Sequence, residues 1–139
     1  MANALYPKWK ETLLQTNANS ALNSAEGATG VYVALVDTGT YTYNALHQFY
    51  SDLGTSVVGT DQEILTKTQL DGVFDGTDVV FPNVSGPSVE ALVIYRKTTG
   101  ASSAWPLIAY IDSGVTGLPV TPNGGNINIT WDVAGIFTL

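Results

Sequence analysis

The chain has 139 residues, of which 45% are apolar and only 12% are charged, and its formal net charge is −7. This length predicts one domain with a sizeable core, and the apolar fraction argues against intrinsic disorder. After residue 16 the only basic residues are Lys67, Arg96 and Lys97, so nucleic acid and anionic membranes, which are bound through many basic side chains, are poor candidates as partners.

The first thirty residues predict an N-terminal arm (1–30) made of a short helix and a linker. Pro7 suits the first position of a helix, and residues 17–30, NANSALNSAEGATG, have the polar composition of a flexible linker. We expect the arm to fasten the protein to a partner, and the candidate contact residues are Tyr6, Lys8, Trp9, Leu13 and Leu14. The alternative is a terminal helix that docks on its own domain.

Residues 31–139 form a succession of short strand candidates separated by turn residues. Several, such as SVEALVIYRK at 88–97, are apolar on both faces, which is typical of strands covered on both sides. We therefore predict an all-β fold, an antiparallel β-sandwich or jelly-roll-like domain over residues 31–139. The expected core residues are Val33, Leu35, Leu92, Ile94, Ile111, Ile129 and Trp131.

One helix is expected between the strands, over residues 44–54. Asn44 can cap it and Gly54 can end it. Its apolar positions have helical spacing, and they are Leu46, Phe49, Tyr50 and Leu53. His47, Gln48, Ser51 and Asp52 would then face away from the core.

Two apolar segments end alike, in ALVDTG (34–39) and AYIDSG (109–114). The tripeptides Asp37-Thr38-Gly39 and Asp112-Ser113-Gly114 are typical of aspartic proteases, in which two carboxylates share a proton. A two-lobed protease does not fit in one chain of this length. Turn chemistry explains both copies, because Asp bonds to its own turn and Gly accepts positive φ. We expect the two carboxylates to lie more than about 8 Å apart, too far to share a proton.

The other reactive side chains do not form a recognisable catalytic or metal-binding pattern. Asp71, Asp75 and Asp78 are close in sequence but lack the spacing of an EF-hand loop, so we interpret them as turn residues rather than calcium ligands. His47 is the only histidine and there is no cysteine, which leaves no nucleophile pattern and no zinc set. We expect no enzymatic activity and no cofactor.

The amino-terminal residues lack the apolar stretch of a signal peptide, and no apolar run reaches 18 residues. We therefore expect neither secretion nor a membrane span.

The most distinctive residues of the sequence lie in six segments that are spread along nearly the whole chain. They are ANALYPKWKETLL, VALVDTGTYTYN, HQFYSDL, SVEALVIYRKTTG, LIAYIDSGVTGLPVTPNGG and ITWDVAGIFTL. Together they resemble a family of small virion proteins of tailed bacteriophages. Within such particles the size, acidity, β-rich pattern and N-terminal arm are similar to those of capsid decoration (cement) proteins.

This resemblance implies a structural protein on the outer surface of the capsid, made in the host cytoplasm. Its implied partners are the major capsid protein and further copies of itself, as a trimer or dimer. A tail or head–tail component is the second possibility. A ligand- or sugar-binding β-sandwich is the rival class, and it would need a concave patch formed by Tyr41, Tyr43, Trp105 and Tyr110.

Overall fold

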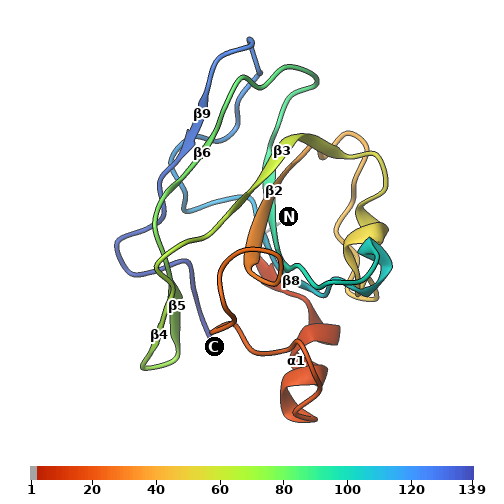
Figure 1. Cartoon of the computed structure of the whole chain (residues 1–139). Helices are drawn as coiled ribbons and strands as arrows, with labels where there is room; N and C mark the ends of the chain where they lie inside the picture. The colour runs from red at the N-terminus through yellow and green to blue at the C-terminus, as the bar shows by residue number, and fades with distance from the viewer. Residues whose placement is uncertain (1–2) are drawn as a thin grey trace.

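The computed structural model describes residues 3–139 and is mostly strands in antiparallel sheets, with one short α-helix (Figure 1). The fold is therefore all-β, as the sequence predicts. In chain order its elements are β1 (Ala4–Leu5), α1 (Pro7–Leu14), β2 (Val31–Val36), the 3₁₀ turn η1 (Tyr50–Leu53), β3 (Val57–Glu63), β4 (Thr68–Leu70), β5 (Val73–Asp75), β6 (Val79–Phe81), β7 (Ala91–Arg96), the 3₁₀ turn η2 (Ser102–Ala104), β8 (Leu107–Ile111), β9 (Ile127–Ile129) and β10 (Phe137–Thr138).

The largest sheet has five strands in the order β1-β8-β7-β2-β3. Its middle strands, β7, β2 and β8, are buried almost throughout. This burial explains why their sequences are apolar at successive positions, since both faces of the sheet are covered. The smaller sheets lie on one side of it, and the loops that carry η1 and η2 lie on the other (Figure 1).

Two smaller sheets complete the strand pairing, one ordered β10-β5-β4 and one formed by β6 and β9. β4 and β5 form a hairpin in which Leu70 pairs with Val73. Asp71 and Gly72, which connect them, have φ values of 53° and 80°, as a tight turn of the type favoured in hairpins requires. The sheets do not close on one another, so a two-layer sandwich or jelly roll stays a prediction.

All seven predicted core residues are buried. Val33, Leu35, Leu92, Ile94 and Ile129 have no exposed surface, and the other two, Ile111 and Trp131, are at most 6% exposed. The continuous apolar runs of β2, β7 and β8 and the alternation in β9 therefore identified the core correctly.

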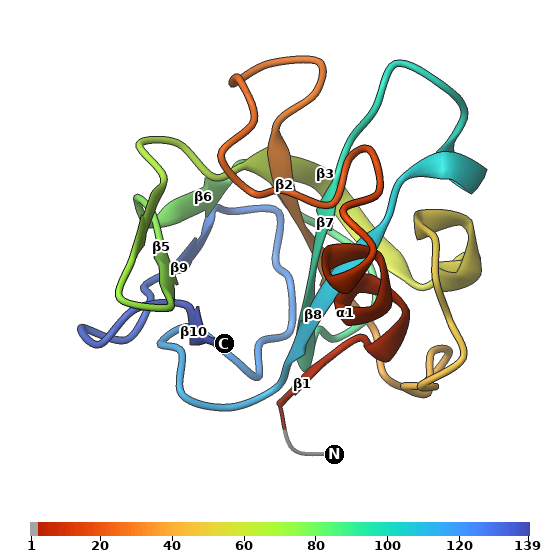
Figure 2. The same cartoon turned by 90° about the horizontal axis from the view of Figure 1, so that it is seen from below.

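The N-terminal segment is docked on its own domain, which corrects the expectation of an arm on a flexible linker. β1 pairs with β8, and the Tyr6 amide donates to the Ile108 carbonyl at 2.9 Å. The helix α1 follows directly and lies beside β8 (Figure 2). Leu22 and Ser20, in the segment expected to be a free linker, are also buried. The sequence analysis kept this docking as its alternative.

The helix expected over residues 44–54 is wrong, because only the short turn η1 forms there and Leu46 is 77% exposed. Residues 48–50 instead run beside the segment that leads into β8. The Leu107 amide donates to the Gln48 carbonyl, and the Tyr50 amide donates to the Trp105 carbonyl. These long-range backbone hydrogen bonds require an extended chain, and they override the helical spacing of the side chains.

Candidate functional site

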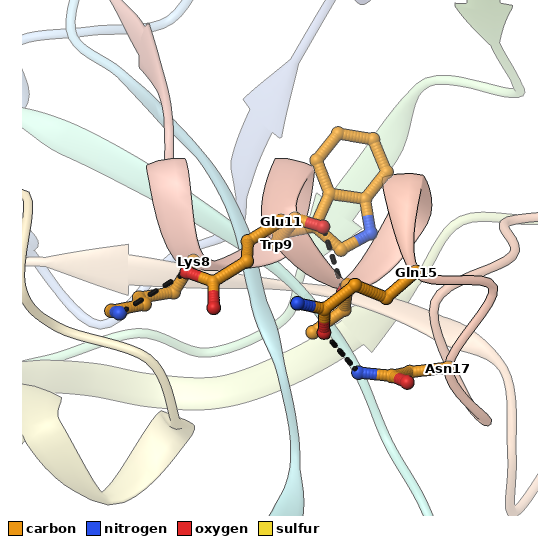
Figure 3. A network of polar contacts seen from close by, with 6 residues as sticks. Lys8, Trp9, Glu11, Gln15 and Asn17 are labelled. Carbon is orange, nitrogen blue, oxygen red and sulfur yellow. Dashed lines mark hydrogen bonds and ion pairs between the residues drawn. The ribbon is translucent and has the colours of Figure 1, made fainter.

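The five predicted contact residues are divided between core and surface. Tyr6 has no exposed surface and Trp9 is 2% exposed, so neither reaches a partner while the segment is docked. Lys8 forms an ion pair with Glu11 at 3.1 Å, and Figure 3 shows the Trp9 ring pointing away from this pair. Leu13 is half-buried and Leu14 is 88% exposed. Partner contact itself stays a prediction.

Trp9 is held in place by specific contacts. Its indole N–H donates to the Ser20 carbonyl at 2.9 Å, and its ring meets Phe137 edge-on, with the centroids 5.8 Å apart. The Thr12 hydroxyl donates to the Trp9 carbonyl, and the Asn17 amide group donates to Gln15 at the end of the helix (Figure 3). The indole therefore joins α1, the following segment and β10.

An apolar pocket of about 260 Å³ lies between α1 and the sheet that contains β5 and β10. Its lining is mostly apolar and consists of Trp9, Leu13, Leu22, Val73, Phe74, Phe137 and Leu139, together with Gln69 and Gly72. Leu139 lines this pocket, and Leu14 and Leu70 directly follow the lining residues Leu13 and Gln69 in the chain. The side chains of all three leucines are exposed. We call these three residues the leucine end.

A second cluster lies on the loop-covered side of the large sheet, around Asp61 of β3. The hydroxyls of Tyr50 and Tyr95 both donate to Asp61 Oδ2 at 2.7 Å. The rings of Tyr95 and Trp105 stack 5.9 Å apart with an interplanar angle of 8°. Lys97 Nζ lies 5.2 Å from the centroid of the Trp105 ring, in the geometry of a cation–π contact.

Burial dominates the electrostatics of this cluster. It raises the pKa of Asp61, while the hydrogen bonds from Tyr50 and Tyr95 and the charge of Lys97 lower that pKa without cancelling the effect. Burial, with the charge of Asp61, also raises the pKa of Tyr95 far above its usual value. Asp61 Oδ1 is buried without a hydrogen-bond partner among the described residues.

His47 is not the exposed helix residue that its spacing predicted. It is half-buried, and its Nδ1 lies 2.9 Å from the Tyr41 hydroxyl, which in turn lies 2.8 Å from the Tyr6 hydroxyl. Burial and the hydrogen bond to Tyr41 raise the pKa of Tyr6 far above its usual value. This chain of polar contacts connects the docked N-terminal segment to the loop that was expected to be a helix.

The aromatic patch proposed for sugar binding is not assembled as one surface. Tyr41, Tyr43 and Tyr110 lie together, with ring centroids 5.5 Å apart for Tyr43 and Tyr110. Tyr41 and Tyr110 are buried. Trp105 belongs instead to the cluster around Asp61.

The two Asp-Thr/Ser-Gly corners follow β2 and β8, two interior strands of the large sheet. β2 and β8 each pair antiparallel with β7 and so run in the same direction. The two corners are therefore similar strand ends, separated by β7 and by two strand spacings of about 5 Å each. The Asp37 carboxylate accepts the Gly39 amide at 2.8 Å, the turn contact expected from the sequence. The separation of the two carboxylates stays a prediction.

Two of the three acids in DGVFDGTD accept backbone hydrogen bonds, one from the next residue and one from a distant part of the chain. Asp75 accepts the Gly76 amide at 2.9 Å, and Asp78 accepts the Trp131 amide at 3.0 Å. Within residues 3–139 no group of three or more His, Cys, Asp or Glu side chains is placed to hold a metal ion. In the same range no helix is long and apolar enough to cross a membrane.

Sequence reasoning missed Asp61 and its tyrosines. Val33 pairs with Gln62 but Leu35 pairs with Val58, so residues 59–61 bulge opposite Ala34. The bulge begins at Gly59, whose φ is 73°, and it turns the Asp61 side chain toward Tyr50 and Tyr95. A glycine inside a strand is the available signal for such a bulge, but the polar sequence of β3 was not recognised as a strand.

Comparison of the chain with models of protein families found no match, and comparison with curated protein sequences found no match either.

Proposed function

We propose that this protein is a non-catalytic structural protein of a tailed-phage virion, and that it decorates the outer surface of the capsid. The proposal takes its class from the sequence segments that resemble small virion proteins. Its partners would be the major capsid protein and further copies of this chain.

The leucine end is the observation that carries the proposal. Leu14, Leu70 and Leu139 are between 65% and 88% exposed. Leu139 lines an apolar pocket, and Leu14 and Leu70 are the chain neighbours of its lining residues Leu13 and Gln69. Exposed apolar surface of this kind favours a protein contact, because covering it removes apolar area from water. On the capsid, the surface that covers the leucine end would be an apolar patch of the major capsid protein.

The acidic side chains support a non-catalytic role. Glu26 accepts the Thr66 amide, Glu63 accepts the Gly27 amide, and Asp132 accepts the Ala134 amide. These bonds, like those of Asp37 and Asp78, hold loops and turns in place. Carboxylates used in this way contribute to the rigidity that a reinforcing protein requires.

We further propose that the sheets act as the two layers of a β-sandwich. The five-stranded sheet would be one layer, and the β6–β9 and β10-β5-β4 sheets together would be the other. The buried side chains of all three sheets join one core, which supports this arrangement.

Binding to particles that lack the protein tests the proposed function. The purified chain is added to such particles, and bound protein is measured by co-sedimentation and located by image reconstruction. We expect saturable binding at symmetry-related positions on the outer shell. Absence of binding, or binding confined to the tail, would contradict decoration.

A matched pair of variants tests the leucine end. Leu14→Gln should weaken particle binding about tenfold, since it removes an exposed apolar contact without adding charge. Leu46→Gln is the control, because Leu46 is 77% exposed but lies in the loop before η1. Equal affinities for the two variants would show that the leucine end is not the contact surface.

A further inference from the structure

β4 is an unprotected sheet edge. It is the terminal strand of the β10-β5-β4 sheet, and Thr68, Gln69 and Leu70 are all exposed. Sheet edges are usually protected from pairing by charged residues or proline within the strand. β4 has neither, and Leu70 is 71% exposed.

The hairpin geometry shows which backbone groups of β4 are available. Its two-residue turn makes Leu70 and Val73 a hydrogen-bonded pair. Hydrogen-bonded and non-hydrogen-bonded pairs alternate in an antiparallel ladder, so the next pair, Gln69 and Phe74, is non-hydrogen-bonded. The N–H and C=O of Gln69 therefore point away from β5, toward the free edge.

Two side chains of opposite charge flank this strand. Lys67 precedes β4, and Asp71 follows it in the exposed turn. Within residues 3–139 the one ion pair is Lys8–Glu11, and neither the Lys67 nor the Asp71 side chain has a hydrogen bond to another described residue. Lys67 and Asp71 thus stand at the two ends of β4, and the Glu26 carboxylate, which accepts the Thr66 amide, lies at the Lys67 end.

We propose that β4 pairs antiparallel with β4 of a second copy of this chain, about a two-fold axis at Gln69. The two Gln69 residues then exchange two backbone hydrogen bonds on the axis. Thr68 of each copy then lies opposite Leu70 of the other copy. Lys67 of each copy lies next to Asp71 of the other copy, so the two-fold axis produces this charge contact two times. The edge is self-complementary in hydrogen bonding and in charge.

Charge complementarity is the argument for a second copy as the occupant. Two chains of net charge −7 repel each other, and the reciprocal Lys67–Asp71 contacts are attractive where the copies meet. A two-fold interface uses the same patch on both subunits, so a positive group at one end of the strand must meet a negative group at the other end. Lys67 and Asp71 fulfil this condition. The resulting dimer would have a continuous six-stranded antiparallel sheet.

This inference deepens the proposed function by naming the surface through which copies associate, and it rests on the self-association in that proposal. It does not use Leu14, whose variant tests particle binding, and it shares only Leu70 with the leucine end. The two proposals can therefore fail separately.

Proline substitution at Gln69 is the sharpest test. Gln69→Pro removes the outward N–H but no hydrogen bond to β5, and edge strands tolerate proline in that position. Gln69→Ala is the matched control, because it also loses the Gln69 side-chain bond to the Leu22 carbonyl but keeps the N–H. By analytical ultracentrifugation we expect a dimer for wild type and Gln69→Ala, and a dissociation constant about tenfold or more higher for Gln69→Pro.

Cysteine pairing tests the register, since the natural chain contains no cysteine. Thr68 and Leu70 of the other copy form a non-hydrogen-bonded pair with Cα atoms about 4.5 Å apart, within reach of a disulfide. Two Thr68 residues lie diagonally at about 7–8 Å, which is too far. A mixture of Thr68→Cys and Leu70→Cys chains should therefore form a crosslinked heterodimer under mild oxidation, and each variant alone should not.

Several outcomes would overturn the inference. These are a monomeric wild type at millimolar concentration, a dimer that Gln69→Pro leaves intact, and crosslinking of Thr68→Cys with itself. If Gln69→Pro is folded and monomeric by circular dichroism and sedimentation but still binds particles, self-pairing through β4 is supported and is separate from decoration. If the dimer forms but no particle binds, the β4 inference stands and the proposed function fails.

Discussion

Asp61 lies in an environment that its polar sequence neighbours do not suggest. Two tyrosine hydroxyls donate to one carboxylate oxygen, and the other oxygen is buried without a partner among the described residues. Its pKa is raised because burial penalises the charged form more than the tyrosines and Lys97 stabilise it. The carboxylate thus costs stability when it is ionised.

The sign of the pH effect follows from this raised pKa. An acid with a higher pKa in the folded state adds stability that is complete below the unfolded pKa of about 3.9 and is lost as the pH rises through the folded pKa. The Asp61→Asn variant cannot titrate at this position. Its free energy of unfolding, measured in urea between pH 7 and pH 4, should therefore fall relative to wild type as the pH is lowered.

Asp52→Asn is a control of opposite sign. Burial alone would raise the pKa of Asp52, but hydrogen bonds from the Phe49 and Gln48 amides outweigh it and lower that pKa. Its contribution is present above the unfolded pKa and is lost as the pH falls. If both variants change in the same direction relative to wild type, the buried-acid description of Asp61 is wrong.

The N-terminal segment shows, at the scale of an element, how packing replaces intrinsic helix stability. α1 has eight residues, no side-chain N-cap, no acidic residue in its first turn and no basic residue in its last. Such a helix is marginal alone. It is held by the Tyr6 backbone bond to β8 and by Trp9, which contributes to the core from the first turn.

Trp9→Ala should lower the free energy of unfolding by about 3–5 kcal/mol, because it removes a buried aromatic ring and its hydrogen bond to Ser20. Leu14→Ala is the control on the same helix, and its effect should stay within about 0.5 kcal/mol. Both are measured by denaturant unfolding of the full chain. A loss below about 1 kcal/mol for Trp9→Ala would mean that the segment undocks easily and can act as an arm.

At the scale of the whole molecule, the three sheets share one core rather than forming separate units. Trp131, which follows β9, shows the connection most clearly. Its indole N–H donates to the Thr77 carbonyl and its backbone N–H donates to Asp78, both at 3.0 Å. The residue is 6% exposed, so the chain after β9 is fastened to the entry of β6.

Trp131→Ala should cost about 3–5 kcal/mol of unfolding free energy. The loss should appear in one cooperative transition, since a single domain with one core unfolds as a unit. Far-ultraviolet circular dichroism and the fluorescence of the remaining tryptophans should give the same midpoint. Val133→Ala, at a fully exposed position two residues later, is the control. Separate midpoints for the two probes would contradict a shared core.

The parts of the fold that could be predicted from the sequence are those governed by local side-chain pattern. β2, β7 and β8 have long apolar runs, and a strand covered on both faces requires them, so the class and the core followed directly. The corner at Asp37 was also predictable, because an Asp–Gly turn closes within three residues.

What only the tertiary structure decided depends on contacts between distant parts of the chain. Residues 44–54 have helical spacing, but hydrogen bonds to residues 105–107 hold part of them extended. The N-terminal segment has the composition of a free arm, yet Tyr6 and Trp9 fill sites formed by other elements. In the third case, Asp61 in the bulge of β3 accepts hydrogen bonds from two tyrosines that lie 11 and 34 residues away in the chain. Local pattern reports which face of a segment is apolar, whereas the partner of that face is set by the free energy of packing the whole chain.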